Sequence, residues 1–443
     1  MSYSDPAGTQ IPISVVELVA SRPHPVGDIV LNPGGPGLSG VQFLRESRHI
    51  FPASLRARFT LVSFDPRGVG SSEPLRCLTA AETRAWISLN PAPSTPQQIH
   101  HAVSARKAFV RDCEQSASTR LISSMSTANN ARDMDRLRVA LDQSRLTYYG
   151  SSYGTYLGMV YAEMFPRNVR AMVFDGPIDP RFIYSETSEA QQVVGYETDL
   201  HDFLAWWAKC SSCSRSFPRP PARGYAALMA HFKRGLVIPA HLGALGGREA
   251  VGYGTALLGV IAELGSKENW PYLADALAEA EKGDGGSLAV YAYASYGVQA
   301  DGSFSNYRFA NTATWCLDWP APTTIRAYQT LATQLAKSAP DFGAWEAWSR
   351  LTCRYWPARA GTHPGPVHAS GAPPILVIGS TRDPATPYAW AKDLTTQLPR
   401  ATLLTRSGAG HTAYQFSSCV RKWADRYLET LKMPPAETVC PSN

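Results

Sequence analysis

Residues 146–155 read LTYYGSSYGT, an apolar run that leads into the motif G-x-S-x-G. The run predicts a buried strand, and the stretch 155–165 that follows predicts a helix. A sharp turn between a strand and a helix needs small residues on both sides of the serine, because the strained backbone must expose its hydroxyl. We therefore expect Ser152 to present its hydroxyl from a tight turn, whereas Ser151 is a neighbour with no part in the chemistry.

A serine hydroxyl is a weak nucleophile at neutral pH and needs a base that a carboxylate orients. Two residues suit these roles, because His411 follows a Gly-Ala-Gly loop after a strand-like run, and Asp383 lies in the segment STRDP that follows the apolar run ILVIG at 375–379. The chain order Ser152, Asp383, His411 is that of the α/β-hydrolase fold. Asp175, which also ends a predicted strand, is an alternative acid. A surface-loop role for His411 and a helix-cap role for Asp383 are the structural alternatives.

Apolar runs bounded by Gly or Pro alternate with longer amphipathic stretches, first between residues 28 and 180 and again between 373 and 432. This alternation indicates βαβ units and a mostly parallel sheet. We expect strands at 28–32, 59–65, 146–150, 169–175, 374–380 and 401–405, and helices at 129–141 and 416–431.

The middle of the chain breaks this rhythm. Residues 181–356 are rich in helical patterns and contain eight of the eleven tryptophans. We expect residues 1–180 to form the N-terminal part of the core, 181–356 a helical cap or lid, and 357–443 the C-terminal part of the core, which carries the acid and the base.

The charge that develops on the substrate oxygen needs two backbone N–H donors, one from the residue after the nucleophile and one from a Gly-rich loop. Tyr153 supplies the first. The loop is NPGGPG at 32–37, whose prolines lack an N–H, so Gly34, Gly35 and Gly37 are the candidates. We choose Gly35, which matches the donor of this loop in related hydrolases.

The same loop contains G-x-G-x-x-G at 35–40, and Asp65 follows 25 residues later, as in a dinucleotide site. Pro36 removes one of the backbone donors that would cradle a phosphate, so an oxidoreductase is a weak alternative. The sequence shows no metal-ligand constellation, and we expect no cofactor.

The composition excludes several classes of protein. The chain has 443 residues, of which 44% are hydrophobic and 18% charged, enough to bury a large core. Its 42 basic and 36 acidic residues give a net charge of +6 with no basic stripe, which argues against a nucleic-acid partner. No apolar run reaches the roughly 18 to 20 residues of a membrane span. We expect no transmembrane segment, and a monomer or weak oligomer.

Eight cysteines form an even set, which suits four disulfides in an oxidising compartment; eight buried thiols are the alternative. The C-x-x-C at 210–213 lacks the second pair of a zinc site and the context of a thioredoxin motif, so we expect a local disulfide there. The predicted pairs are Cys77–Cys113, Cys210–Cys213, Cys316–Cys353 and Cys419–Cys440.

The first twenty residues carry no basic segment ahead of their apolar stretch, which Glu17 interrupts, so they do not resemble a signal peptide. We expect either a cytoplasmic protein or one whose leader has been removed.

These motifs resemble those of the tripeptidyl aminopeptidase-like serine hydrolases, relatives of proline iminopeptidase. The resemblance covers most of the chain and is thin in the cap. It rests on NPGGPG at 32–37, DPRG at 65–68, YGSSYGT at 149–155, DGPIDP at 175–180, TWCLD at 314–318, DPATP at 383–387 and GH at 410–411.

The resemblance implies an α/β-hydrolase fold with a large helical cap, and a secreted enzyme that cleaves short peptides from a free N-terminus. It implies Ser152, Asp383 and His411 as the triad, and Thr386 as a residue that supports it. An enzyme that reads the N-terminus needs acidic groups to hold the ammonium, since an unpaired buried charge is costly. Candidates in the cap are Glu186, Glu189 and Asp318.

Three functional hypotheses follow. The first is an aminopeptidase that releases a short peptide or a single residue through an acyl-enzyme. The second is an esterase or amidase that applies the same mechanism to a small metabolite, because one serine turn serves both bond types. The third is a binding or structural protein on a hydrolase fold. The expected partner is thus a peptide or a small-molecule substrate, in a secreted or extracytoplasmic setting, with a cytoplasmic one left open.

Overall fold

A computed structural model describes the chain with short gaps. It leaves out residues 1, 2, 4–6, 182–185, 212, 214–216, 246, 359–366 and 443, and the side chains of 186–189, 244 and 248.

The core is an eight-stranded sheet in the order β1-β3-β2-β4-β5-β8-β9-β10. Every neighbouring pair is parallel except β1 with β3 at one edge. The strands are β1 (Val15–Leu18), β2 (Gly27–Asn32), β3 (Phe59–Phe64), β4 (Leu146–Ser151), β5 (Val169–Asp175), β8 (Ile375–Arg382), β9 (Ala401–Ala409) and β10 (Val439–Cys440). The α/β fold with a mostly parallel sheet is therefore confirmed.

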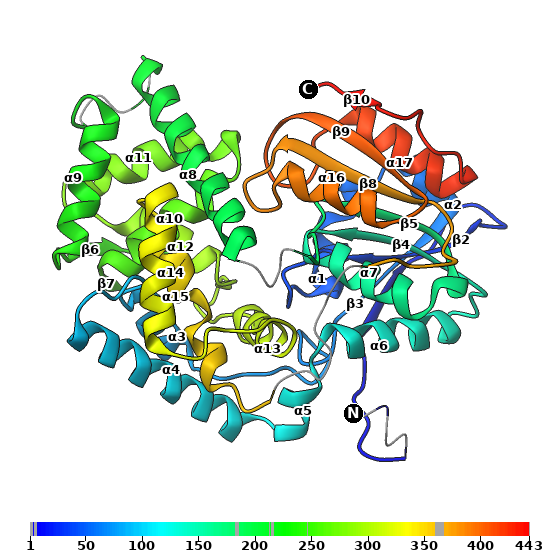
Figure 1. The fold of residues 1–443 in the computed structure, drawn as a ribbon, viewed down its shortest axis with the longest axis horizontal. Helices are drawn as coiled ribbons and strands as arrows, with labels where there is room; N and C mark the ends of the chain where they lie inside the picture. The colour runs from blue at the N-terminus through cyan, green and yellow to red at the C-terminus, as the bar shows by residue number, and fades with distance from the viewer. Residues whose placement is uncertain are drawn as a thin grey trace.

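Helices cover both faces of this sheet (Figure 1). Because side chains alternate along a strand, Ile29 and Leu31 of β2 pack on one face, while Val30 packs on the other. The first face carries α1 (Gly40–Ser47), α2 (Ala53–Arg58) and α17 (Ser418–Thr430), and the second carries α6 (Thr127–Ala140), α7 (Tyr153–Met164) and α16 (Tyr388–Gln397).

A second, helical body is inserted between β5 and β8 and lies beside the sheet in Figure 1. It has its own hydrophobic core, built around Phe203, Trp207, Tyr225 and Trp270. Its elements are α8 (Glu186–Lys209), α9 (Pro221–Lys233), β6 (Ile238–His241), β7 (Arg248–Val251), α10 (Tyr253–Leu264), α11 (Trp270–Glu281), α12 (Gly286–Ala294), α13 (Tyr307–Asp318), α14 (Ile325–Ser338) and α15 (Gly343–Ser349). We call this body the cap.

Helices from before residue 180 also pack on the cap. They are α3 (Ala80–Ser88), α4 (Pro96–Ser116) and α5 (Thr119–Ser124), of which α3 contacts α10 and α12, and α4 contacts the segment Arg350–Tyr355. The approach is close, because a Cβ added at Gly254 of α10 would lie 2.2 Å from the carbonyl oxygen of Leu89. In space, therefore, the body beside the sheet contains part of the segment 1–180.

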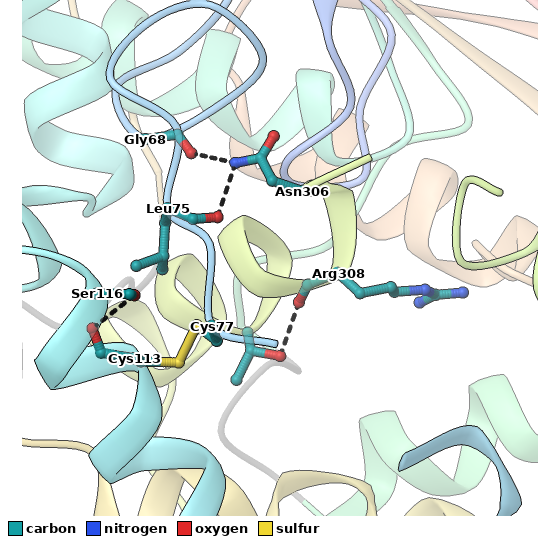
Figure 2. Close-up of a disulfide and its surroundings, with 8 residues drawn as sticks. Gly68, Leu75, Cys77, Cys113, Ser116, Asn306 and Arg308 are labelled. Carbon is teal, nitrogen blue, oxygen red and sulfur yellow. Dashed lines mark hydrogen bonds between the residues drawn. A yellow bond between two sulfur atoms is a disulfide. The ribbon is translucent and has the colours of Figure 1, made fainter. Parts of the chain in front are cut away.

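Four disulfides join the pairs Cys77–Cys113, Cys210–Cys213, Cys316–Cys353 and Cys419–Cys440, which are the pairs that the sequence predicted. All eight cysteines are thus used, and the alternative of eight thiols does not occur. The first disulfide fixes α4 to the segment that leaves the sheet after β3 (Figure 2). In the same view Asn306 donates to the carbonyls of Gly68 and Leu75, at 2.6 and 3.1 Å, and so joins that segment to the start of α13.

Two features are absent from the residues that the structure describes. No helix in this part of the chain is long and apolar enough to cross a membrane. Within the same residues, no group of three or more His, Cys, Asp or Glu side chains is placed to hold a metal ion.

Candidate active site

Ser152 stands at the turn from β4 into α7 with φ 54° and ψ −125°, a strained backbone for a residue with a side chain. The two glycines of the motif explain why the turn can form. A Cβ at Gly150 would lie 2.4 Å from the carbonyl oxygen of Gly154, and a Cβ at Gly154 would lie 2.6 Å from the carbonyl oxygen of Asn32. The small residues therefore let strand, helix and neighbouring loop meet closely enough to push the Ser152 hydroxyl outward.

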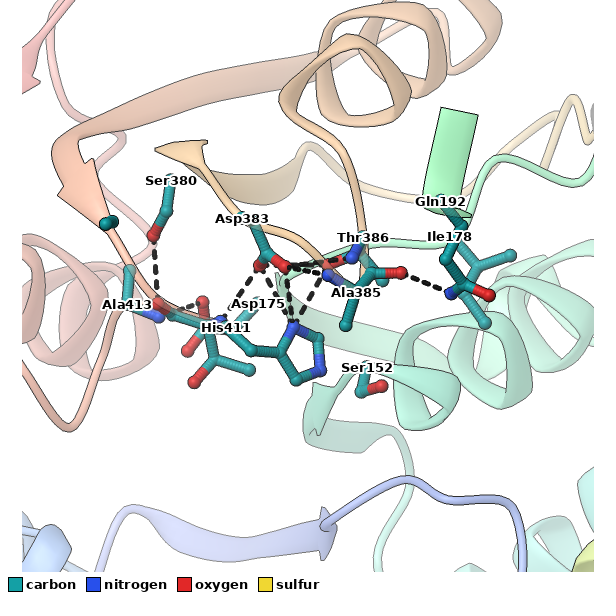
Figure 3. A network of polar contacts seen from close by, with 12 residues as sticks. Ser152, Asp175, Ile178, Gln192, Ser380, Asp383, Ala385, Thr386, His411 and Ala413 are labelled. Atoms are coloured by element: carbon teal, nitrogen blue, oxygen red, sulfur yellow. Dashed lines mark hydrogen bonds and ion pairs between the residues drawn. The ribbon is translucent and has the colours of Figure 1, made fainter. Parts of the chain in front are cut away.

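His411 and Asp383 meet at the carboxyl edge of the sheet, on the loops after β9 and β8 (Figure 3). Nδ1 of His411 lies 2.9 and 3.0 Å from the two carboxylate oxygens of Asp383. The carboxylate is fixed in turn, because it accepts the backbone N–H groups of Ala385, Thr386 and Thr412 at 2.8 to 3.0 Å. This network holds the Nδ1 edge of the imidazole in place.

Thr386 adds a side-chain contact to both members of this pair. Its hydroxyl lies 3.0 Å from Oδ2 of Asp383 and 3.3 Å from Nδ1 of His411. The residue singled out by the family resemblance thus contacts the acid and the base together, and a hydroxyl there limits rotation of both.

Ser152 lies on the other side of the imidazole. In Figure 3 the second ring nitrogen is turned away from Asp383, on the side of the ring where Ser152 is drawn. Both side chains line one cavity. The three loops, distant along the chain, therefore converge at one edge of the sheet, where Ser152 and His411 share one cavity.

The electrostatics suit an imidazole that takes up a proton. Burial by itself lowers the pKa of His411, but the charge of Asp383 and its hydrogen bond outweigh burial and raise the pKa above its ordinary value. A base whose protonated form is stabilised in this way accepts the serine proton more readily.

Asp175, the alternative acid, has another position. Its carboxylate accepts the backbone N–H groups of Ala413 and Tyr414, at 2.8 and 2.9 Å, and the hydroxyl of Tyr149 at 2.9 Å. Burial raises its pKa to about 6 despite these bonds. Asp175 therefore fixes the chain just after His411, while Asp383 makes the contact with the imidazole ring.

The loop 32–37 runs beside the serine turn. A Cβ at Gly34 would lie 2.6 Å from the carbonyl oxygen of Ser151 and 3.2 Å from the backbone nitrogen of Tyr153. The N–H of Gly34 already binds Oδ1 of Asn32 at 3.0 Å. Of the three candidate donors in this loop, Gly34 is thus occupied, and Gly35 lines the cavity that holds Ser152.

Asp318 lies outside the described lining of the cavity. Its carboxylate is buried away from the cavity lining and accepts the backbone N–H of Thr127 at 2.9 Å and the Thr127 hydroxyl at 2.5 Å. The same hydroxyl lies 2.5 Å from the phenol of Tyr153. Asp318 is therefore a buried carboxylate below the serine turn and outside the described cavity lining, and its binding of a substrate ammonium stays a prediction. A local motif could not distinguish these roles, because both use a buried carboxylate.

Glu186 and Glu189 fall in the first turns of α8, and their side chains lie outside the described residues. Another acid lies at the site instead. Glu346 of α15 lines the cavity, and burial raises its pKa to about 7. No sequence motif pointed to this residue. The available signal was a single acid in the tryptophan-rich stretch GAWEAWS.

The cavity has a volume of about 640 Å³ and is lined by core loops and cap helices. Its cap wall is aromatic, with Trp315, Trp319, Trp345 and Trp348. Three arginines also line it, namely Arg106, Arg308 and Arg350, none of which the sequence analysis selected. The space can hold a short peptide or a compound of similar size next to Ser152.

Comparisons with known proteins agree with this geometry. The family model described as "alpha/beta hydrolase fold" matches residues 29–194, and the one described as "TAP-like protein" matches residues 337–440. The serine protease Hip1 of Mycobacterium tuberculosis is 32% identical over 452 residues, which cover 99% of this chain and 85% of that protein.

Two further relatives carry other names. Carboxylesterase B of Mycobacterium tuberculosis is 34% identical over 449 residues, covering 99% of this chain and 84% of that protein. Tripeptidyl aminopeptidase of Streptomyces lividans is 28% identical over 469 residues, covering 99% of this chain and 82% of that protein. The chain therefore belongs to the tripeptidyl aminopeptidase-like family of α/β-hydrolases and is a serine hydrolase.

Proposed function

We propose that the protein is an aminopeptidase that releases a short peptide or a single residue from the free N-terminus of its substrate. The proposal joins the likeness to Hip1 and to tripeptidyl aminopeptidase with one feature of the cavity, the carboxylate of Glu346.

In the proposed reaction the Ser152 oxygen attacks the scissile carbonyl carbon, and Nε2 of His411 takes up the hydroxyl proton. Asp383 holds the imidazole by Nδ1 and stabilises the charge that it gains. The backbone N–H groups of Tyr153 and Gly35 bind the oxyanion. His411 then gives its proton to the leaving amine, the C–N bond breaks, and the acyl group remains on Ser152. Water, activated by the same imidazole, hydrolyses this ester.

Glu346 supports recognition of the amino group. Its carboxylate forms no hydrogen bond or ion pair with any residue that the structure describes, and burial alone raises its pKa. Burial raises the pKa of Tyr196, and the charges of Asp383 and Glu346 raise it further, so both carboxylates lie within electrostatic reach of one cavity-lining ring. A substrate ammonium would supply the missing partner close to the reacting groups.

The test compares matched tripeptide p-nitroanilides with a free or an acetylated N-terminus, using wild-type protein and the Ser152→Ala variant. We expect turnover of the free peptides to exceed that of the acetylated ones by roughly tenfold or more, since a hydrogen bond between charged groups contributes about 1.5 to 3 kcal/mol. The Ser152→Ala variant should turn over neither. Equal rates for the two peptide forms would end the proposal of N-terminal recognition.

An esterase that acts on a small metabolite is the second candidate, because a relative that is 34% identical is named carboxylesterase B. A panel of p-nitrophenyl esters, run beside the peptides with the same protein, separates the two. A kcat/KM for the best ester far above that of every peptide would favour the esterase.

We also propose that the protein works outside the cytoplasm. Four disulfides support this location, since disulfides persist in oxidising compartments and are rare in the cytosol. Mass spectrometry of a non-reduced digest of protein from its native source should find the four linked peptide pairs. Eight free thiols would contradict the assignment.

A further inference from the structure

The charge on the cavity wall is opposite to that expected for a site that only holds an ammonium. Among the described lining residues Glu346 is the one carboxylate, whereas Arg106, Arg308 and Arg350 contribute three guanidinium groups. Cations around a site repel a positively charged substrate unless the substrate also carries a negative group. The arginines therefore raise the question of what they bind.

Arg106 lies on α4 and has no polar partner among the residues that the structure describes. Its Nε and Nη1 atoms are buried and form no hydrogen bond. Its guanidinium carbon stands 4.3 Å from the ring centroid of Trp86, which packs the cation without satisfying its donors. Arg67, by contrast, makes hydrogen bonds of 2.6 and 2.7 Å from its guanidinium to the carboxylate of Asp133.

Arg308 lies on α13 and extends into the same cavity. In Figure 2 its side chain points away from the Cys77–Cys113 disulfide. Its Nε donates to the carbonyl of Ser295 at 2.9 Å, and its guanidinium carbon lies 4.9 Å from the ring centroid of Tyr296. The phenol of Tyr296 also acts on the charge of Arg106, so both arginines are neighbours of this one ring.

An unpaired buried cation is costly, and a protein that keeps one in the cavity that holds its serine can offset the cost when a ligand anion arrives. Burial lowers the pKa of Arg106 to about 10, which leaves the guanidinium charged at neutral pH. A carboxylate matches a guanidinium best, since its two oxygens accept two parallel N–H donors.

We propose that Arg106 and Arg308 form a subsite for a carboxylate of the substrate, so that the enzyme prefers peptides with an acidic group. That group is either an acidic side chain or the free C-terminal carboxylate of a short peptide. The inference rests on the proposed function in taking the substrate to be a peptide. Glu346 and the two arginines would then bind opposite charges of one short chain.

Binding, rather than turnover, tests this subsite. Calorimetry with the Ser152→Ala variant measures the Kd of alanine tripeptides in two arms. The first arm places Glu or Gln at each position in turn in the tripeptide amide, and the second compares trialanine with trialanine amide. We expect the carboxylate form to bind roughly 10 to 100 times more tightly in one arm, the range for hydrogen bonds between charged groups. The arm that shows the preference identifies the source of the carboxylate.

Three further variants, each in the Ser152→Ala background, locate the effect. Arg106→Met keeps an unbranched chain against Trp86 and should abolish the preference, and Arg308→Met should weaken it. Arg111→Met is the matched control, because Arg111 lies on the same helix with a side chain that is 62% exposed, and it should retain the preference. Circular dichroism reports whether each variant is folded, and Arg308→Met decides the matter if Arg106→Met is not.

Equal affinities in both arms, or a preference that survives both substitutions, would overturn the subsite. Turnover by the unmodified enzyme is measured separately with neutral peptides. If those peptides are cleaved while the binding arms show no preference for a carboxylate, the subsite alone fails. If no peptide is cleaved while the carboxylate preference in binding persists, the proposed peptidase function fails and the subsite stands.

Discussion

Replacing Glu346 by Gln removes the one carboxylate that the described cavity wall offers to a substrate ammonium. Glutamine keeps the length of the side chain and one carbonyl oxygen, so the cavity stays filled while the charge is lost. We expect the variant to lose activity against free peptides and to keep it against N-acetylated ones.

The magnitude follows from the surroundings of the carboxylate. It forms no hydrogen bond or ion pair with a described residue, so an ammonium would be its only strong partner there. A hydrogen bond between charged groups contributes about 1.5 to 3 kcal/mol, which corresponds to a decrease of roughly 10- to 150-fold in kcat/KM for free peptides. Acetylated peptides, which carry no ammonium, should change by less than about twofold on the same reasoning.

The pH dependence of the ratio of free to acetylated peptide turnover is a second, independent test of the role of Glu346. Burial raises the pKa of Glu346 to about 7, so its ionised fraction falls as the pH drops through 7, whereas an exposed glutamate stays ionised to about pH 5. His411 must also be neutral to act, but both peptide forms need it, and its effect cancels in the ratio of free to acetylated turnover. In wild-type protein this ratio should therefore fall between pH 7.5 and pH 6, where the substrate amine, with an ordinary pKa of about 7.7 to 8.0, is largely protonated, and in Glu346→Gln it should be flat.

The assay uses the paired p-nitroanilides at several pH values, with active sites counted by fluorophosphonate titration. Glu281→Gln is the matched control, because it removes the same charge from an exposed position at the end of α11 in the cap. A ratio that is unchanged in Glu346→Gln, or that falls equally in the control, would refute the reasoning.

Other perturbations test the remaining parts of the site. Asp383→Asn should lower kcat by roughly 10³- to 10⁴-fold because the imidazole loses its carboxylate partner. Asp175→Asn should lower kcat much less, since Asp175 binds the backbone after the histidine. A larger decrease in kcat for Asp175→Asn than for Asp383→Asn would exchange the roles of the two acids. Thr386→Val should lower kcat about tenfold and leave KM unchanged, because one hydrogen bond to a charged group is lost. Thr386→Ser keeps the hydroxyl and should restore the rate. A change confined to KM would contradict a supporting role for Thr386. Burial raises the pKa of Asp318 to about 7, so the folded state holds its proton more tightly than the unfolded state and stability falls as the pH rises from about 4 to 7. In urea titrations, the free energy of unfolding should decrease between pH 5 and 7 by about 2 kcal/mol less in Asp318→Asn than in the wild-type protein. The same pH dependence of the unfolding free energy in both proteins would refute this prediction.

Local sequence patterns predicted most of the strands of the core sheet. The inner strands lie within a few residues of the predicted ranges because alternating and apolar runs record burial directly. The predicted strand ends were less good, since β8 reaches Arg382 and β9 reaches Ala409. The edge strands β1 and β10 were not predicted. Both are short and partly exposed, so their sequences resemble loops.

In the candidate site, too, some residues could be predicted from the sequence and others could not. Ser152, Asp383 and His411 each follow a strand, and the parallel sheet brings such positions to one edge, so the sequence could place them together. Glu346 and Arg106 could not be found in this way. They lie on helices far apart in the chain, and their access to the cavity depends on how α15 and α4 pack, which leaves no local pattern.

The most direct test of the account is the rate at which a fluorophosphonate modifies the protein, with the modified residue mapped by mass spectrometry. We predict one adduct, on Ser152, and a rate that falls by roughly 10³-fold or more in His411→Ala, because the serine loses its base. An adduct at another residue, or an undiminished rate in that variant, would contradict the account.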